Sequence, residues 1–108
     1  MSLSTHVLDA STGSPAVGVS VRVEVQDGEL WHPGPEHRTD ADGRISSFDP
    51  PAAGVHRIRF DTGAYFAARG VETFYPEVLV TFVVTDDTRH YHVPLLLSPF
   101  AFSTYRGS

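Results

Sequence analysis

The chain has 108 residues, a net charge of -5 at pH 7 and an apolar fraction of 41%. We expect one domain over residues 1–108, because a chain of this length has room for a single hydrophobic core. All eight basic residues are arginine and cysteine is absent, which excludes disulfides, thiolate chemistry and lysine Schiff bases. The negative charge argues against nucleic acid as a partner, and no apolar run reaches the ~20 residues of a membrane helix.

The two ends of the chain show no targeting signal. Residues 1–10 contain neither a basic segment nor a long apolar stretch, so we expect no signal peptide. Residues 106–108 are not a peroxisomal address. A cytoplasmic protein is therefore the expectation.

Short strands are predicted along most of the chain, beginning with residues 3–8. Valine then alternates with polar residues over residues 19–26, the pattern of a strand with one buried face. Asp27-Gly28 is a favoured type I′ pair, so residues 29–31 are predicted to return as the next strand of a hairpin. Further strands are predicted at residues 44–48, 56–60, 78–84, 91–97 and 100–106.

One short helix interrupts this pattern, over residues 62–70, with Thr62 as its cap and Gly70 at its end. Turn-forming residues separate the strands at 11–15, 40–43, 49–51 and 86–88. Several short strands divided by such turns indicate a β-sandwich or a barrel.

Three histidines are candidates for chemistry. His90 and His92 are two residues apart on one predicted strand, so both point to the same face. With His6 they could supply three ligands to a divalent metal. The alternative is that these are surface histidines without a function, and spacing alone favours this second interpretation.

The segment Asp40-x-Asp42-Gly43 begins like a calcium loop. An EF-hand loop needs an acidic twelfth residue, however, and Pro51 occupies that place. We therefore predict a tight turn that presents Arg44 at the start of a strand. No Gly-x-Ser-x-Gly motif is present, so a serine nucleophile is not expected.

Aromatic residues continue almost to the end of the chain, at Phe100, Phe102 and Tyr105. Chain ends usually fray, and they contain few aromatic residues. We therefore expect this segment to be docked against the rest of the protein. A closing strand would explain the aromatic residues but not the final Tyr-Arg-Gly-Ser sequence.

Three segments together resemble the 5-hydroxyisourate hydrolases of the transthyretin family. They are residues 3–19, residues 39–44, and residues 90–99 with the terminal 105–108, and their order and spacing match the family over the whole chain. The terminal Tyr-Arg-Gly-Ser is the most specific, because it distinguishes the hydrolases from the hormone-carrying transthyretins. Phe100 and Phe102 depart from the family, which usually has tyrosines there.

The resemblance implies a mostly β fold, a transthyretin-like sandwich of two sheets with about eight strands and one short helix. It also implies a homotetramer with active sites where two dimers meet. The substrate would be 5-hydroxyisourate, a small molecule of urate breakdown whose lactam is opened by water. Neither a metal nor an organic cofactor is expected, and membranes and nucleic acids are not expected as partners.

Carried over residue by residue, the resemblance implies catalytic roles for His6, Arg44, His92 and Ser108. It assigns substrate binding to His6 and Arg44 together with Tyr105, Arg106 and Gly107. His6 and His92 would activate water and pass a proton, in an order that the sequence leaves open. Arg44 would orient the lactam or stabilise the oxyanion, and His90 is expected to be a surface residue.

Two other functions remain open. One is a non-catalytic, transthyretin-like carrier of a small aromatic ligand. The other is a carboxypeptidase-regulatory-like module, which shares the opening Thr12-Gly13-x-Pro15-x-x-Gly18. Neither alternative accounts for the terminal Tyr-Arg-Gly-Ser.

Overall fold

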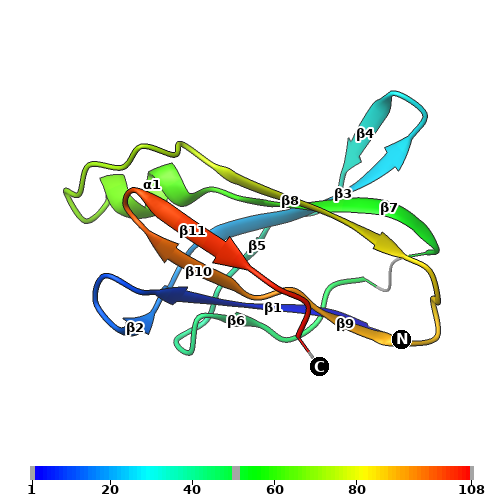
Figure 1. Cartoon of the computed structure of the whole chain (residues 1–108), viewed down its shortest axis with the longest axis horizontal. Helices are drawn as coiled ribbons and strands as arrows, with labels where there is room; N and C mark the ends of the chain where they lie inside the picture. Colours follow the sequence, from blue (N-terminus) through cyan, green and yellow to red (C-terminus); the bar gives the residue numbers. More distant parts are fainter. Residues whose placement is uncertain (1, 50–51, 108) are drawn as a thin grey trace.

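The computed structural model describes residues 2–49 and 52–107. Within these ranges two β-sheets pack face to face, and a short helix lies at one end of the sandwich (Figure 1). The predicted two-sheet fold with one short helix is therefore confirmed.

The first sheet is built around β1 (Ser2–Asp9), which lies at its centre. β1 pairs in parallel with both β9 (His90–His92) and β10 (Leu95–Ser98). It pairs antiparallel with β2 (Ser14–Pro15) and β6 (Arg44–Ile45). β11 (Ala101–Thr104) pairs with β10 and is the last strand at that end of the sheet, over the described residues.

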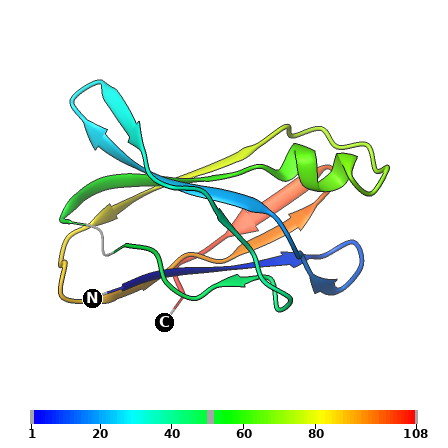
Figure 2. The ribbon, with the colours of Figure 1, turned by 180° about the vertical axis from the view of Figure 1, so that it is seen from behind.

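The second sheet has the order β4 (Leu30–Pro33), β3 (Ser20–Asp27), β7 (Gly54–Phe60) and β8 (Val78–Val84). The short strand β5 (His37–Arg38) also pairs with β3. The β3–β4 hairpin projects beyond the sandwich (Figure 2). Its loop residues are Gly28 and Glu29, because Asp27 pairs with Leu30. Gly28 alone has a positive φ, of 63°, which fits a type II′ turn and not the predicted type I′.

The structure differs from the prediction at residues 91–97. Instead of one strand there are two, β9 and β10, separated at Val93-Pro94. Proline has no backbone N–H to donate to a ladder, so Pro94 interrupts the pairing. The short strands β2 and β5 were not predicted, since two residues are too few to show a period.

The helix α1 (Thr62–Ala67) is shorter than predicted, and its N-cap is one residue before the predicted cap. Asp61, not Thr62, is the N-cap, and its carboxylate accepts a hydrogen bond from the backbone N–H of Ala64 at 3.3 Å. The chain turns after Ala67 and reaches Gly70, whose φ of 67° few other residues would adopt.

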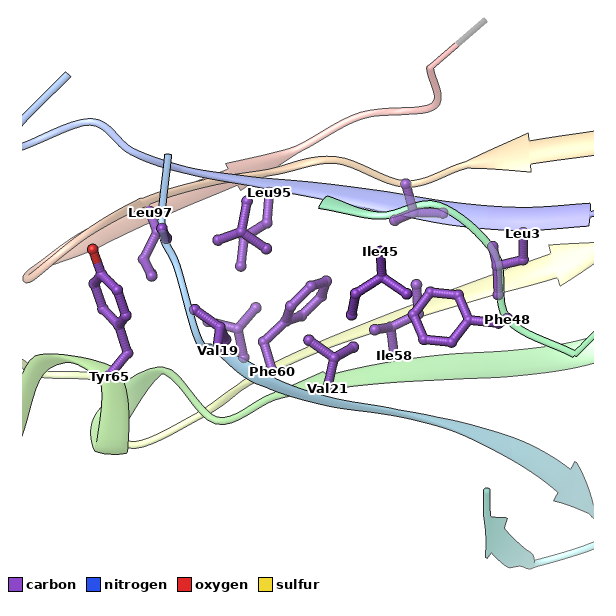
Figure 3. Packing of buried hydrophobic residues seen from close by; sticks show 14 of the residues in the cluster. Leu3, Val19, Val21, Ile45, Phe48, Ile58, Phe60, Tyr65, Leu95 and Leu97 are labelled. Carbon is purple, nitrogen blue, oxygen red and sulfur yellow. The ribbon is translucent and has the colours of Figure 1, made fainter. Parts of the chain in front are cut away.

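The hydrophobic core fills the space between the two sheets (Figure 3). Phe60 and Ile58 enter it from the second sheet, and Ile45 and Leu95 enter it from the first. Side chains of β1 alternate: Leu3, Thr5 and Val7 are buried in the interior. Ser4 and His6 consequently point to the opposite, outer face of the first sheet.

The valine alternation of β3 is only partly buried. Val21 is fully buried, but Val25, nearer the β3–β4 turn, is 45% exposed. Between them Glu24 is buried on the outer face of the second sheet, where it accepts hydrogen bonds from Arg57 and Arg59. Burial alone would raise the pKa of Glu24, but these two guanidinium groups lower it. In the described part of the chain, no helix has the length and apolar character needed to cross a membrane.

Candidate active site

Polar side chains from three strands gather on the outer face of the first sheet. β1 brings Ser4 and His6, which are two residues apart and point the same way. The register of β6 sets Arg44 opposite His6, and the register of β9 sets His92 beside Ser4. His90, two residues before His92, lies on the same side. We call the side chains of Ser4, His6, Arg44, His90 and His92 the histidine face.

A tight turn delivers Arg44 to this face, as predicted. Asp40 Oδ1 accepts hydrogen bonds from the backbone N–H groups of Asp42 and Arg44, both at 2.9 Å. These backbone hydrogen bonds hold the pKa of Asp40 below its ordinary value. Gly43 is required because its φ is 74° and a Cβ atom there would lie 2.5 Å from the carbonyl oxygen of Val7.

His6 is tied to the same turn. Its Nε2 lies 2.9 Å from the carbonyl oxygen of Asp42. A carbonyl can only accept, so Nε2 carries the proton and donates it. Neutral His6 therefore has its lone pair on Nδ1.

His92 is half-buried and is held by Ser4. Its Nδ1 lies 2.7 Å from Ser4 Oγ, and the same hydroxyl lies 3.1 Å from His90 Nε2. The two imidazoles are nearly parallel, with 6.4 Å between their centroids. Burial lowers the pKa of His92, and the neighbouring His90, Arg44 and His6 lower it further. His92 is thus an uncharged imidazole near pH 7, the form that accepts protons.

The end of the described chain is docked on His92. The backbone N–H of Gly107 donates to the carbonyl oxygen of His92 at 2.8 Å. A Cβ atom at position 107 would lie 2.5 Å from His92 Cδ2, so only glycine allows this approach. The Arg106 guanidinium lies over the ring of Tyr91, 5.0 Å from its centroid. Ser108, expected to be catalytic, lies outside the described residues.

A groove of about 360 Å³ borders His92. It lies between β8 and the C-terminal segment, with walls that include Phe82, Tyr91, Tyr105 and Arg106. His92 is the residue common to this groove and the histidine face. The structure thus brings His6, Arg44, His92 and Gly107 together, and it places Tyr105 and Arg106 along the adjoining groove.

Two members of the histidine face were not among the predicted site residues. His90 is exposed, as expected of a surface residue, but it also contacts the hydroxyl that holds His92. Its spacing from His92 was the available signal. Ser4 had no signal of its own in the sequence. Over residues 2–49 and 52–107, the structure contains no group of three or more side chains arranged to hold a metal ion.

One family model and several known proteins match this chain. The model of the HIUase/Transthyretin family matches residues 3–107. The chain is 46% identical to a 5-hydroxyisourate hydrolase of Salmonella dublin, over 98% of this chain and 80% of that protein. It is 45% identical to a 5-hydroxyisourate hydrolase of Caulobacter vibrioides, over 98% of this chain and 97% of the other.

Solved structures give the same picture. The fold superposes on 5-hydroxyisourate hydrolase of Klebsiella pneumoniae with a TM-score of 0.89 and 40% identity, covering all of both chains. It also superposes with a TM-score of 0.89 on sea bream transthyretin in complex with thyroxine, at 34% identity over 97% of this chain and 93% of the other. The chain therefore belongs to the HIUase/Transthyretin family.

Proposed function

We propose that this protein hydrolyses 5-hydroxyisourate, opening its lactam ring to 2-oxo-4-hydroxy-4-carboxy-5-ureidoimidazoline in urate breakdown. The observation that supports this most is the histidine face itself, where His6, Arg44 and His92 come together from three separate strands. The names of the similar hydrolases support the same substrate.

His92 is the general base in this mechanism. Its Nδ1 is engaged with Ser4, so Nε2 is the nitrogen that meets the attacking water. Its lowered pKa keeps it neutral near pH 7, which a base for water requires. The water oxygen bonds to the lactam carbonyl carbon, and His92 Nε2 takes one of the water protons.

Arg44 and His6 complete the reaction on the same face. The fork of donors on Arg44 suits the oxygen atoms of a planar lactam and stabilises the oxyanion that forms on it. His6, opposite Arg44, assists the transfer of the remaining water proton to the leaving nitrogen as the C–N bond breaks. No step calls for a metal or an organic cofactor.

The assembly that we propose is a homotetramer with the histidine faces at the contact between dimers. In a single chain this face is an open sheet surface on which Arg44 is exposed, so a substrate needs a second wall. β8 and β11 are the last strands of their sheets within the described residues, and both lie on the same side of the sandwich (Figure 1). They expose Val83 and Phe102, at 55% and 40%, where a second chain could pair.

A transthyretin-like carrier is the second candidate. The equal TM-scores to a hydrolase and to a thyroxine complex favour neither function, because one fold hosts many activities. The side chains of the face favour the hydrolase. A carrier has no use for a neutral, half-buried histidine beside an arginine, whereas water activation needs both.

The deciding experiment follows the ultraviolet absorbance of 5-hydroxyisourate made in situ by urate oxidation. We expect the protein to accelerate its decay, and His92→Asn to lower kcat by about 100- to 10,000-fold, the usual contribution of general acid–base catalysis. Arg22→Gln, on the second sheet, is the matched control and should leave the rate unchanged. Decay equal to the buffer blank at micromolar protein would reject the hydrolase and leave the carrier.

A further inference from the structure

Ser4 and His90 form a chain of hydrogen-bonding groups that leads away from His92. Ser4 Oγ is 2.7 Å from His92 Nδ1 and 3.1 Å from His90 Nε2, so one hydroxyl contacts both imidazoles. Ser4 itself is only 8% exposed, whereas His90 is exposed. Ser4, the most buried of the three, therefore links half-buried His92 to His90, which is exposed in the single chain.

The direction of the hydrogen bonds follows from the proposed role of His92 as the general base. His92 Nε2 must lack a proton to accept one from water, so Nδ1 of the neutral ring carries the proton. Nδ1–H then donates to Ser4 Oγ. A serine hydroxyl has one proton of its own to donate, and the acceptor at 3.1 Å is Nε2 of His90.

We propose that Ser4 and His90 are a positioning pair and proton exit for His92, a role that rests on the proposed hydrolase function. Ser4 fixes the tautomer of His92 that leaves Nε2 free to act as the base. When Nε2 takes a proton from water, the Nδ1 proton passes to Ser4 Oγ and the hydroxyl proton of Ser4 passes to His90 Nε2. One N–H bond forms on each histidine, one breaks on His92, and His90 releases the proton to solvent.

The reaction needs such an exit. Opening a neutral lactam with water yields a carboxylic acid, and an ordinary carboxyl group with a pKa near 4 is ionised at neutral pH. Each turnover therefore releases one proton. Burial and the neighbouring His90, Arg44 and His6 disfavour a positive charge on His92 itself. Moving the proton to exposed His90 leaves His92 neutral with its remaining proton on Nε2. After the product leaves, Nε2 gives this proton to solvent while Nδ1 regains one through Ser4 and His90, which restores the Nδ1–H form that acts as the base.

The hydrogen-bond arrangement is tested without any substrate, by ¹⁵N chemical shifts of the histidine side chains. We expect His92 to be the Nδ1–H tautomer in the wild-type protein and in Ser4→Thr, which keeps a hydroxyl. Ser4→Ala should give a mixture of tautomers. An Nε2–H tautomer of His92 in the wild-type protein would overturn the proposal.

Kinetics test the exit itself. Ser4→Ala should lower kcat by about 10- to 100-fold, the size of a lost hydrogen bond to a charged group, with little change in KM. Ser4→Thr should recover most of this loss. Thr5→Val removes the neighbouring hydroxyl, which bonds to the Val93 carbonyl in the interior, and should leave kcat unchanged.

His90→Gln distinguishes the uptake of a proton by His90 from its hydrogen bond to Ser4. Glutamine can still hydrogen-bond to Ser4 but does not take up a proton, so kcat should fall and then rise again as imidazole buffer is added. A His90→Gln enzyme with wild-type kcat, or a loss of kcat that no concentration of imidazole restores, would refute the exit. If the wild-type protein proves inactive on 5-hydroxyisourate, the proposed function fails, and the tautomer measurement still judges the Ser4–His92 contact.

Discussion

The reactivity of His92 depends on its surroundings more than on its own chemistry. Burial lowers its pKa, and three neighbours that are or can become cationic, namely His90, Arg44 and His6, lower it further. Ser4 opposes this effect by hydrogen bonding. The balance keeps the imidazole neutral below the ordinary value of 6.5, so it remains a base in mildly acidic solution.

This balance predicts the pH profile of the enzyme. Because the neutral form is active, kcat/KM should fall only as the pH drops through the lowered pKa of His92, below 6.5. Arg44→Gln removes one cation, so the pKa of His92 and the acid limb should both move to higher pH. A proton NMR titration of His92 measures this shift independently of rate. Arg22→Gln is the control variant. If the pKa of His92 is the same in Arg44→Gln as in Arg22→Gln, the prediction is wrong.

Gly107 is needed for space and not for an unusual backbone angle. Gly107→Ala would place a methyl group 2.5 Å from His92 Cδ2, so either the imidazole or the terminal segment must move. We expect a fall in kcat of at least tenfold, about 1.4 kcal/mol of transition-state stabilisation, with little change in the free energy of unfolding.

Gly28→Ala is the matched comparison. Gly28 has a φ of 63° with open space around it, far from the site on the projecting hairpin. Forcing alanine into this backbone region costs about 1–2 kcal/mol, so stability should fall and kcat should stay constant. Denaturation and steady-state kinetics on both variants distinguish the two effects; equal kinetics for the two would show that the contact with His92 is unimportant.

The central element of the molecule is β1, because its two faces serve different purposes. Its inner side chains enter the core, and its outer side chains contribute Ser4 and His6. The end of β1 is anchored to α1, where the hydroxyl of buried Tyr65 donates to Asp9 Oδ2 at 2.8 Å. Burial and this hydrogen bond raise the pKa of Tyr65 to about 12, so it remains a donor.

Tyr65→Phe tests this anchor. Asp9 is 2% exposed, and burial would raise its pKa, but hydrogen bonds from Ser11 and Tyr65 lower it below 3.8. Removing one donor should lower the free energy of unfolding by about 1–3 kcal/mol. Since the pKa of Asp9 is depressed, the loss is present at neutral pH and should disappear as pH falls through that pKa. If urea denaturation at pH 7 shows the same free energy of unfolding for Tyr65→Phe and the wild-type protein, the prediction is wrong. The kcat of Tyr65→Phe should equal that of the wild-type protein.

At the scale of the whole molecule, one side of the sandwich carries two exposed strand edges. The exposed edges of β8 and β11 adjoin there, together with the groove that borders His92. An edge strand with exposed apolar side chains favours pairing with another chain. The proposed dimer therefore uses the same side of the molecule that bears Tyr105 and Arg106, which links assembly to the site.

Val83→Lys tests that link. Val83 lies on β8 and is 55% exposed, and a lysine there introduces charge at the proposed contact. We expect sedimentation velocity to show smaller species, and activity to fall as the tetramer dissociates. Val17→Lys is the control, because Val17 is similarly exposed, at 44%, but lies far along the chain from both edge strands. If Val83→Lys sediments like the wild-type protein with full activity, pairing through β8 is excluded.

Local patterns were enough to predict a β-sandwich or barrel, the position of most strands and the turn before Arg44, whereas the two-sheet form was implied by the family resemblance. Alternation, turn residues and backbone requirements act over a few neighbouring residues, so they can be read directly from the chain. The family and its candidate residues His6, Arg44, His92 and Gly107 were also recognised from motifs. The tetramer, the cytoplasmic location and the role of Ser108 stay predictions.

Only the folded chain revealed Ser4 and His90 as neighbours of one another. They are 86 residues apart, and they meet because β9 pairs in parallel with the start of β1 after Pro94 has separated it from β10. Such pairing depends on how distant strands close over one core, which no local pattern encodes. The same long-range pairing buried His92 and surrounded it with His6 and Arg44, so the lowered pKa that suits it to activate water is a property of the tertiary structure.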